Sequence, residues 1–332
     1  MNTKNRILAL LEEKRGQMIS GESIAEQLNI SRSAVWKAVN GLKKDGHQIE
    51  AVTNNGYCLS ADNNILSVAG MLPFLKTDLN IGSQDHHVQI SSNNIQMHQK
   101  VESTNLIAKA LAAKGAAHGT VIMAEEQTAG RGRYGRPFFS PAGHGIYMSF
   151  VLDPKVLGVD TPGLITTYAA VVVCEAIEAI CGMSPKVKWV NDLFLRGRKI
   201  CGISAEAVMD LESGTMQWIV VGIGINFTLP ALPEELRPIV GAVFEEASPC
   251  VTRSQLAAEV INRLLAPPYS QVKIIEKYRE RLFILGMKVR VEGAVEPYEA
   301  TVLDVDEMGR LLVRNDAEDV VVLSAGEISI RF

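Results

Sequence analysis

The sequence predicts a multidomain protein of the α/β (α+β) class, in which a helical N-terminal unit and a C-terminal β-barrel flank a central sheet with helices. The first observation is length, because 332 residues suffice for two or three domains of roughly 100 to 200 residues each. The second is that the spacing of apolar residues changes near residues 62 and 285. The third is composition, because 47% hydrophobic and 21% charged residues exclude an intrinsically disordered chain.

Residues 1–62 are predicted to form a winged helix-turn-helix. Three short apolar stripes at helical spacing follow one another, and Ser20 precedes the second as an N-cap, while Ser31 or Ser33 precedes the third. Residues 49–59 then form a predicted hairpin, in which Asn54-Asn55-Gly56 supplies the positive φ of a tight turn. Three helices followed by a hairpin have the order of a winged helix-turn-helix.

The helix-turn-helix itself is expected over Met18 to Lys37. Arg32, Ser33, Trp36 and Lys37 lie at the start and on one face of the third helix, where a recognition helix meets the major groove. A net charge of −4 excludes binding through a basic whole-molecule field, so DNA would need this local patch and two copies of it. The alternatives are a protein-binding winged helix and, for Trp36, a place in the small core.

Residues 63–94 are predicted to be a linker, polar and rich in Asn and Ser, with one amphipathic stretch over 66–75. Residues 95–284 then alternate between strands and helices, and 228–250, with four prolines, predicts a mobile loop or lid. The expected elements are strands at 95–101, 121–124, 145–152, 187–190, 200–208 and 216–227, and helices at 103–114, 162–181, 252–265 and 269–285.

Residues 285–332 are predicted to form the small barrel. Short β-branched runs are separated there by turn signals such as Glu307-Met308-Gly309. The expected strands are 287–291, 298–305, 310–313, 320–324 and 328–330.

Cysteine usage and the length of the apolar runs predict a cytoplasmic protein with no membrane contact. The five cysteines form no C-x-x-C pair, so neither a disulfide framework nor a zinc ligand set is indicated. The longest purely apolar run, Ala169–Cys174, is far short of the roughly 20 residues that span a bilayer.

The segment from Gln127 to Pro141 predicts an anion-binding loop. Three glycines alternate with Arg131, Arg133 and Arg136, so bare backbone and guanidinium groups could both approach a phosphate or carboxylate. The pattern is neither a P-loop nor a dinucleotide-binding fingerprint. The alternative is a basic loop that is merely solvated.

Three further motifs are candidates for ligand contact. Lys188, in Lys188-Trp189-Val190-Asn191-Asp192, ends an apolar strand and would be a fixed cation in a low dielectric, or simply a surface lysine. Ser103-Thr104-Asn105 begins a helix, where it could bind a polar ligand or only cap the helix. Gly222–Asn226 permits close approach of a ligand, with Asn226 as its polar contact, or only tight strand packing.

In order and spacing these motifs resemble the biotin protein ligases, in the bifunctional form that is also the biotin operon repressor. The resemblance covers nearly the whole chain. It rests on S-T-N at 103–105, G-R-G-R at 130–133, K-W-x-N-D at 188–192, R-K-x-x-G-I at 198–203, G-x-G-I-N at 222–226 and a barrel ending Gly326-Glu327-Ile328-Ser329. The chain departs from the family at Val190, where proline is usual, and has no tryptophan in 228–250.

The resemblance implies a class II synthetase-like mixed sheet, an SH3-like barrel and a two-step reaction. Biotin and ATP, with Mg²⁺, would give biotinyl-5′-adenylate, which passes biotin to a lysine of the biotin carboxyl carrier domain of acetyl-CoA carboxylase. The implied biotin-binding residues are Ser103, Thr104, Asn105, Gln127, Arg131, Gly132, Arg133 and Lys188, of which Lys188, Arg131 and Arg133 would be catalytic.

Asn226 and Asp192 are implied to contact the adenylate or the metal, and no metal is expected to be fixed by the protein alone. The adenylate-bound form would be a homodimer that binds a palindromic operator. Two rival functions remain: a lipoate-type acyl ligase, and a non-catalytic regulator that senses a metabolite.

Overall fold

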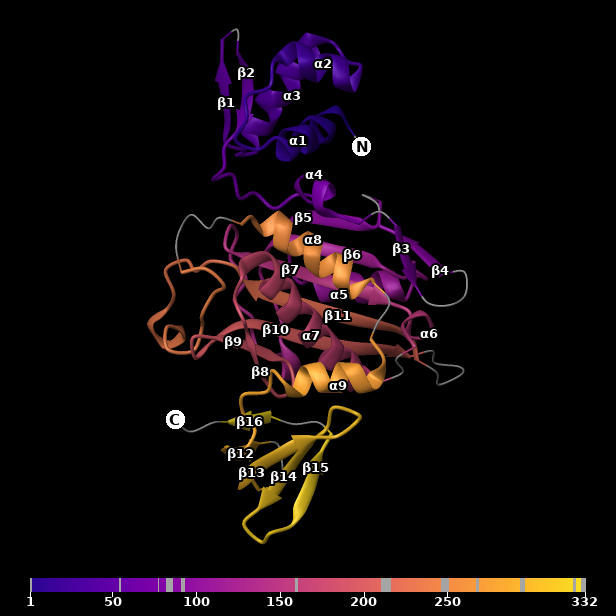
Figure 1. Cartoon of the computed structure of the whole chain (residues 1–332), viewed down its shortest axis with the longest axis vertical. Coiled ribbons are helices and arrows are strands. Elements are labelled where there is room, and N and C mark those ends of the chain that lie inside the picture. The colour runs from indigo at the N-terminus through magenta and orange to yellow at the C-terminus, as the bar shows by residue number, and fades with distance from the viewer. Residues whose placement is uncertain are drawn as a thin grey trace.

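The computed structural model describes residues 2–53, 55–76, 78–81, 86–90, 93–158, 161–209, 216–245, 251–266, 269–292, 296–324 and 327–329. Figure 1 shows a helical unit at one end, a large sheet with helices in the middle, and a small sheet at the other end. Several predicted features lie outside the described residues: Asn54 of the hairpin turn, residues 246–250 of the expected lid, Gly326, and Ile330 of the last expected strand.

The N-terminal unit has the predicted helix-turn-helix order. It consists of α1 (Thr3–Glu13), α2 (Gly21–Leu28), α3 (Arg32–Lys44) and the hairpin β1 (Ile49–Val52) with β2 (Gly56–Leu59). The hydroxyls of Ser20 and Ser31 accept from backbone N–H groups at the starts of α2 and α3, as N-caps do, and Asn29 ends α2 in the left-handed conformation.

The segment between this unit and the central sheet is more structured than a linker. It contains α4 (Val68–Met71), the 3₁₀ turn η1 (Leu72–Phe74) and the hairpin β3 (Asp78–Ile81) with β4 (His86–Gln89). Leu66, Met71 and Leu75 are buried in the central core, because the amphipathic stretch has an apolar face that must be covered.

Arg253, at the start of α8, holds this segment to the central unit. Its buried guanidinium donates to the carbonyl of Asn64 at 2.7 Å and pairs with Glu125 at 2.9 Å. Its backbone N–H donates to Asn64 Oδ1 at 2.8 Å. The link between the two units is therefore a packed, hydrogen-bonded contact.

The central unit is a seven-stranded mixed sheet in the order β5-β6-β7-β11-β10-β9-β8, with β5 and β6 parallel and every other neighbouring pair antiparallel. The strands are β5 (Ile95–Val101), β6 (Thr120–Gln127), β7 (Gly145–Leu152), β8 (Lys186–Lys188), β9 (Asp192–Leu195), β10 (Arg198–Met209) and β11 (Met216–Asn226). The helices are α5 (Thr104–Ala112), α6 (Pro154–Leu157), α7 (Pro162–Cys181), α8 (Arg253–Leu264) and α9 (Gln271–Arg279), and η2 (Arg133–Gly135) and η3 (Glu234–Leu236) are 3₁₀ turns.

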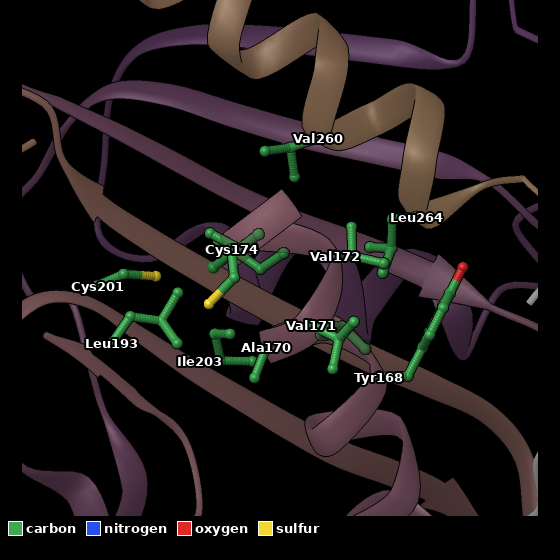
Figure 2. Close-up of a cluster of buried hydrophobic side chains, with 14 of the residues drawn as sticks. Tyr168, Ala170, Val171, Val172, Cys174, Leu193, Cys201, Ile203, Val260 and Leu264 are labelled. Carbon is green, nitrogen blue, oxygen red and sulfur yellow. The ribbon is translucent and has the colours of Figure 1, made fainter. Parts of the chain in front are cut away.

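Helices cover both faces of this sheet. Ile122 and Val220 pack with α5, whereas their chain neighbours Val121 and Val221 belong to the core beneath α7, because successive strand residues point to opposite faces. Figure 2 shows this second core, with α7 between strand residues such as Ile203 and helix α8. Residues 163–181 of α7 are long and apolar enough to cross a membrane, but 78% of that window is buried inside the protein, as in a core helix.

Two predicted boundaries in this unit are wrong. Helix α9 ends at Arg279 and not near residue 285, because the chain then runs beside β8, where Val187 N donates to Arg281 O and Phe283 N donates to Val187 O. The short strand β9 was not expected. The predicted strand 187–190 is β8, which ends at Lys188 before the chain turns into β9.

Much of the expected lid is packed. Val243 N donates to the carbonyl of Asn226, and the Phe244 ring lies 5.1 Å from that of Phe227. Residues 239–241 hydrogen-bond to Lys199 on β10.

The C-terminal unit is a five-stranded antiparallel sheet in the order β15-β14-β13-β12-β16. Its strands are β12 (Lys288–Glu292), β13 (Tyr298–Val305), β14 (Leu311–Asn315), β15 (Val320–Leu323) and β16 (Glu327–Ser329).

Candidate active site

A cavity of about 200 Å³ opens on the α5 side of the central sheet, and its lining includes residues from each of the four motifs that the sequence analysis selected for ligand contact. The walls come from the start of α5, the end of β6, the glycine-rich loop, the ends of β8 and β9, and the middle of β10 and β11. The predicted residues that line it are Ser103, Thr104, Asn105, Gln127, Arg131, Gly132, Arg133, Lys188 and Asp192.

One end of the cavity is neutral and rich in hydrogen-bonding groups. Thr104 N donates to Gln127 Oε1 at 2.9 Å, and Gln127 Nε2 donates to Ser140 Oγ at 3.0 Å. Among the residues that the structure describes, the buried Ser103 hydroxyl caps no N–H of α5. The capping interpretation of this motif is therefore wrong for Ser103, and its hydroxyl lines the cavity.

The other end is cationic. Lys188 is half-buried at the end of β8, and Arg133 donates to Asn191 Oδ1 at 3.4 Å with its guanidinium 5.1 Å from the centre of the Tyr134 ring. Lys199 pairs with Asp192 at 2.7 Å. Arg131 and Glu102 are 3.8 Å apart and more than half exposed, so this pair holds the loop only weakly.

The glycine-rich loop closes on itself along the rim of the cavity. Phe138 N donates to Gly130 O, and Gly132 N donates to Arg136 O, both at 2.8 Å. These two bonds bring the arginines of the loop to the same opening.

Two glycines of β11 make room for side chains of the site. A Cβ on Gly222 would lie 2.3 Å from Asn105 Oδ1, and one on Gly224 would lie 2.5 Å from the Phe138 ring. The glycines thus make room for the side chains of Asn105 and Phe138, which line the cavity. The sequence analysis had considered only ligand approach and tight strand packing for this motif.

Asn226 lies outside the lining as the described residues define it. Its amide nitrogen donates to the carbonyl of Gly241 at 2.9 Å and so connects β11 to the segment after η3. The predicted contact of Asn226 with an adenylate or metal gains no support from this placement.

Sequence reasoning missed several lining residues, among them Phe138, Lys199, Ser204 and Ile328. Phe138 and Lys199 stand inside motifs that had been quoted, so their chemistry could have been considered. Ile328 also stands inside a quoted motif, at the end of the predicted barrel, but no local pattern indicates that it reaches the cavity from β16 of the C-terminal sheet. Trp189 makes a second link to that sheet, because its buried indole N–H donates to Gly309 O at 3.0 Å.

The predicted DNA-contacting residues share one exposed face of α3. Arg32, Ser33, Trp36 and Lys37 are all exposed, and the Trp36 side chain is 62% exposed. The interpretation of Trp36 as a core residue is therefore wrong.

Known protein families match both the central unit and the N-terminal unit. Residues 97–226 match the model of the biotin/lipoate A/B protein ligase family, and residues 3–58 match that of a helix-turn-helix domain. The bifunctional ligase/repressor BirA of Bacillus subtilis is 29% identical over 93% of both chains. The biotin–[acetyl-CoA-carboxylase] ligase of Mycobacterium tuberculosis is 30% identical over 68% of this chain and 85% of its own.

A solved structure gives the same result for the fold. The biotin protein ligase from Aquifex aeolicus in complex with biotin and ATP aligns with a TM-score of 0.60 and 25% identity, over 72% of this chain and 98% of that one. Fold and site together define a protein ligase of the biotin/lipoate class joined to a helix-turn-helix unit. The chain belongs to the biotin protein ligase family, in its bifunctional ligase/repressor form.

Proposed function

We propose that this enzyme activates biotin with ATP and transfers it to a lysine of the biotin carboxyl carrier domain of acetyl-CoA carboxylase. The main support is that one cavity joins a neutral end, with Ser103, Thr104 and Gln127, to a cationic end with Lys188 and Arg133. The neutral end suits the ureido ring of biotin, and the cationic end suits its carboxylate and the phosphates of ATP.

In the first step a carboxylate oxygen of biotin attacks the α-phosphorus of ATP. The bond between the α-phosphorus and the bridging oxygen breaks, and pyrophosphate leaves with the electron pair. Both reactants are anionic, so Lys188, Arg131 and Arg133 are proposed to offset their repulsion and the charge of the transition state.

In the second step the amine of the carrier lysine attacks the acyl carbon of the adenylate. An amide bond forms, AMP leaves with the electron pair of the broken C–O bond, and the attacking nitrogen loses a proton. The same cations are proposed to stabilise the leaving phosphate.

Magnesium is proposed to enter with the nucleotide. Among the described residues, no group of three or more His, Cys, Asp or Glu side chains is arranged to hold a metal. Asp192 is the carboxylate in the cavity lining and is paired with Lys199. It could contact a metal already bound to ATP, which would offset negative charge on the phosphates.

The helix-turn-helix is proposed to bind operator DNA, with the adenylate-bound protein as a homodimer that represses biotin synthesis genes. The exposed face of α3 supports this, because side chains that contact a major groove must be accessible on one helix face. A single such patch is small, and a dimer doubles it.

Native mass spectrometry after mixing the protein with Mg·ATP, biotin and lipoate in equal amounts tests the ligase. A bound biotinyl-adenylate mass is expected. Lipoyl-adenylate would preserve the mechanism and overturn the substrate, and neither adduct would favour the non-catalytic regulator.

A further inference from the structure

Ser149 lies beneath the neutral end of the cavity, fully buried in the middle of β7. Its Oγ is 2.7 Å from Thr104 Oγ1 and 2.6 Å from Asn105 Oδ1. Thr104 and Asn105 line the cavity, so Ser149 would act on a ligand through these two neighbours.

Glu206, on β10, decides which way the Asn105 amide faces. Asn105 Nδ2 donates to Ser204 Oγ at 3.0 Å and to Glu206 Oε1 at 3.3 Å. A carboxylate only accepts hydrogen bonds, so the amide nitrogen must face β10 and the amide oxygen must face Ser149. Lys109 pairs with Glu206 and holds the carboxylate there.

The single hydroxyl hydrogen of Ser149 is therefore committed to Asn105, because an amide oxygen can only accept. The contact between Ser149 and Thr104 must then use the hydroxyl hydrogen of Thr104. The other nearby acceptor for that hydrogen is Gln127 Oε1, at 3.1 Å. Gln127 Oε1 already accepts from Thr104 N at 2.9 Å, whereas the contact between the hydroxyls of Ser149 and Thr104 is shorter, at 2.7 Å. With its hydrogen on the buried Ser149, the Thr104 oxygen keeps a lone pair for the cavity.

We propose that Ser149 is a positioning residue that fixes Thr104 as a hydrogen-bond acceptor, so that the cavity selects a cyclic urea over rings without N–H groups. The proposal rests on the proposed function, in which the ligand is biotin and its ureido ring offers two N–H donors beside a carbonyl. A ring without N–H groups, such as the dithiolane of lipoate, would leave the buried Thr104 oxygen unpaired and would bind more weakly.

The test compares Ser149→Ala with wild type for biotin and for a biotin analogue in which one ureido N–H is replaced by oxygen. Ser149→Cys is a second variant, because it fills the space with a weak donor. Ser254→Ala is the matched control, since Ser254 is also buried but stands at the start of α8, outside the cavity lining. Dissociation constants, KM for biotin and kcat for adenylate formation are measured for each.

Both Ser149 variants should raise KM for biotin about tenfold with kcat nearly unchanged, and should reduce the preference for biotin over the analogue. The control should have the same dissociation constants as wild type for both ligands. The positioning role would be overturned if the Ser149 variants kept the wild-type preference for biotin, or if they lost affinity equally for biotin and the analogue. In that case the proposed function would still stand, provided that the wild-type protein binds biotin. Wild-type protein that does not bind biotin would overturn both.

Discussion

Lys188 stands at the last position of β8, half-buried in the cavity wall and in register with Asp192 on β9. Its strand position fixes the backbone, so in the proposed reaction the ammonium group would need little reorganisation to meet charge that develops on a phosphate. At this scale, the proposed chemistry depends on single charges whose positions are fixed by neighbouring strands.

Lys188→Ala is expected to slow adenylate formation by more than about tenfold and to leave the fold intact. Lys186→Ala, two residues away on the same strand and exposed, is the matched control. Single-turnover measurement of pyrophosphate release compares the two. A near-normal rate for Lys188→Ala would exclude the proposed role.

Arg133→Gly, and likewise Arg131→Gly, should release the adenylate into solvent. Each change removes a guanidinium from the rim and adds backbone freedom to the glycine-rich loop. Mass-spectrometric mapping of biotinylated lysines in a protein mixture is the measurement. Wild type should label the carrier domain alone, and a Gly variant equally confined to that domain would show that the loop does not retain the intermediate.

At the scale of elements, the N-terminal unit combines a well-capped pair of helices with a buried titratable group. His47 connects α3 to β1 and is buried, which lowers its pKa below the ordinary value of 6.5. In the unfolded chain this histidine binds a proton as the pH falls through about 6.5, whereas in the folded unit it binds the proton only at lower pH. This histidine therefore makes the unit less stable as the pH falls below that value.

His47→Gln should weaken this loss of stability. Amide hydrogen exchange of α3, measured between pH 7.5 and 5.5 in the full chain and corrected for the intrinsic pH dependence of exchange, reports the stability of the unit. The wild type should lose more protection than the variant. Glu12 acts in the opposite direction because burial raises its pKa, but it is present in both proteins. Identical profiles would contradict the assignment to His47.

At the scale of the whole molecule, the DNA-binding unit is held to the central unit by Arg253 and Asn64, and the C-terminal sheet reaches the cavity through Ile328. Glu125, which pairs with Arg253, is two residues from Gln127 in the cavity. Strand β6 and Arg253 thus connect the cavity with the segment that follows the helix-turn-helix unit.

Biotin plus ATP should raise the affinity for operator DNA by about tenfold or more, the usual size of coupling between two sites. The DNA is selected by the liganded protein from a random pool, and an inverted repeat is expected because a dimer presents two α3 helices. Gel shifts then compare protein with and without both ligands. Trp36→Ala should lose DNA binding and retain ligase activity, and affinity independent of biotin and ATP would refute the regulatory proposal.

The sequence by itself determined most of the elements and the motifs that line the cavity. Apolar spacing located α7 at its full length, and serine caps located α2 and α3, because these signals are local. The motifs that line the cavity were found for the same reason: glycine, arginine and lysine in short fixed spacings already limit what a loop or strand end can bind.

Only the tertiary structure decided which of these residues meet and which do not. The shortened α9, the strand β9 and the place of Asn226 depend on pairings between distant segments, for which no local pattern exists. The same holds for Ile328 at the cavity and for Ser149 beneath Thr104. A buried polar side chain takes its role from the partners that surround it, and packing alone selects those partners.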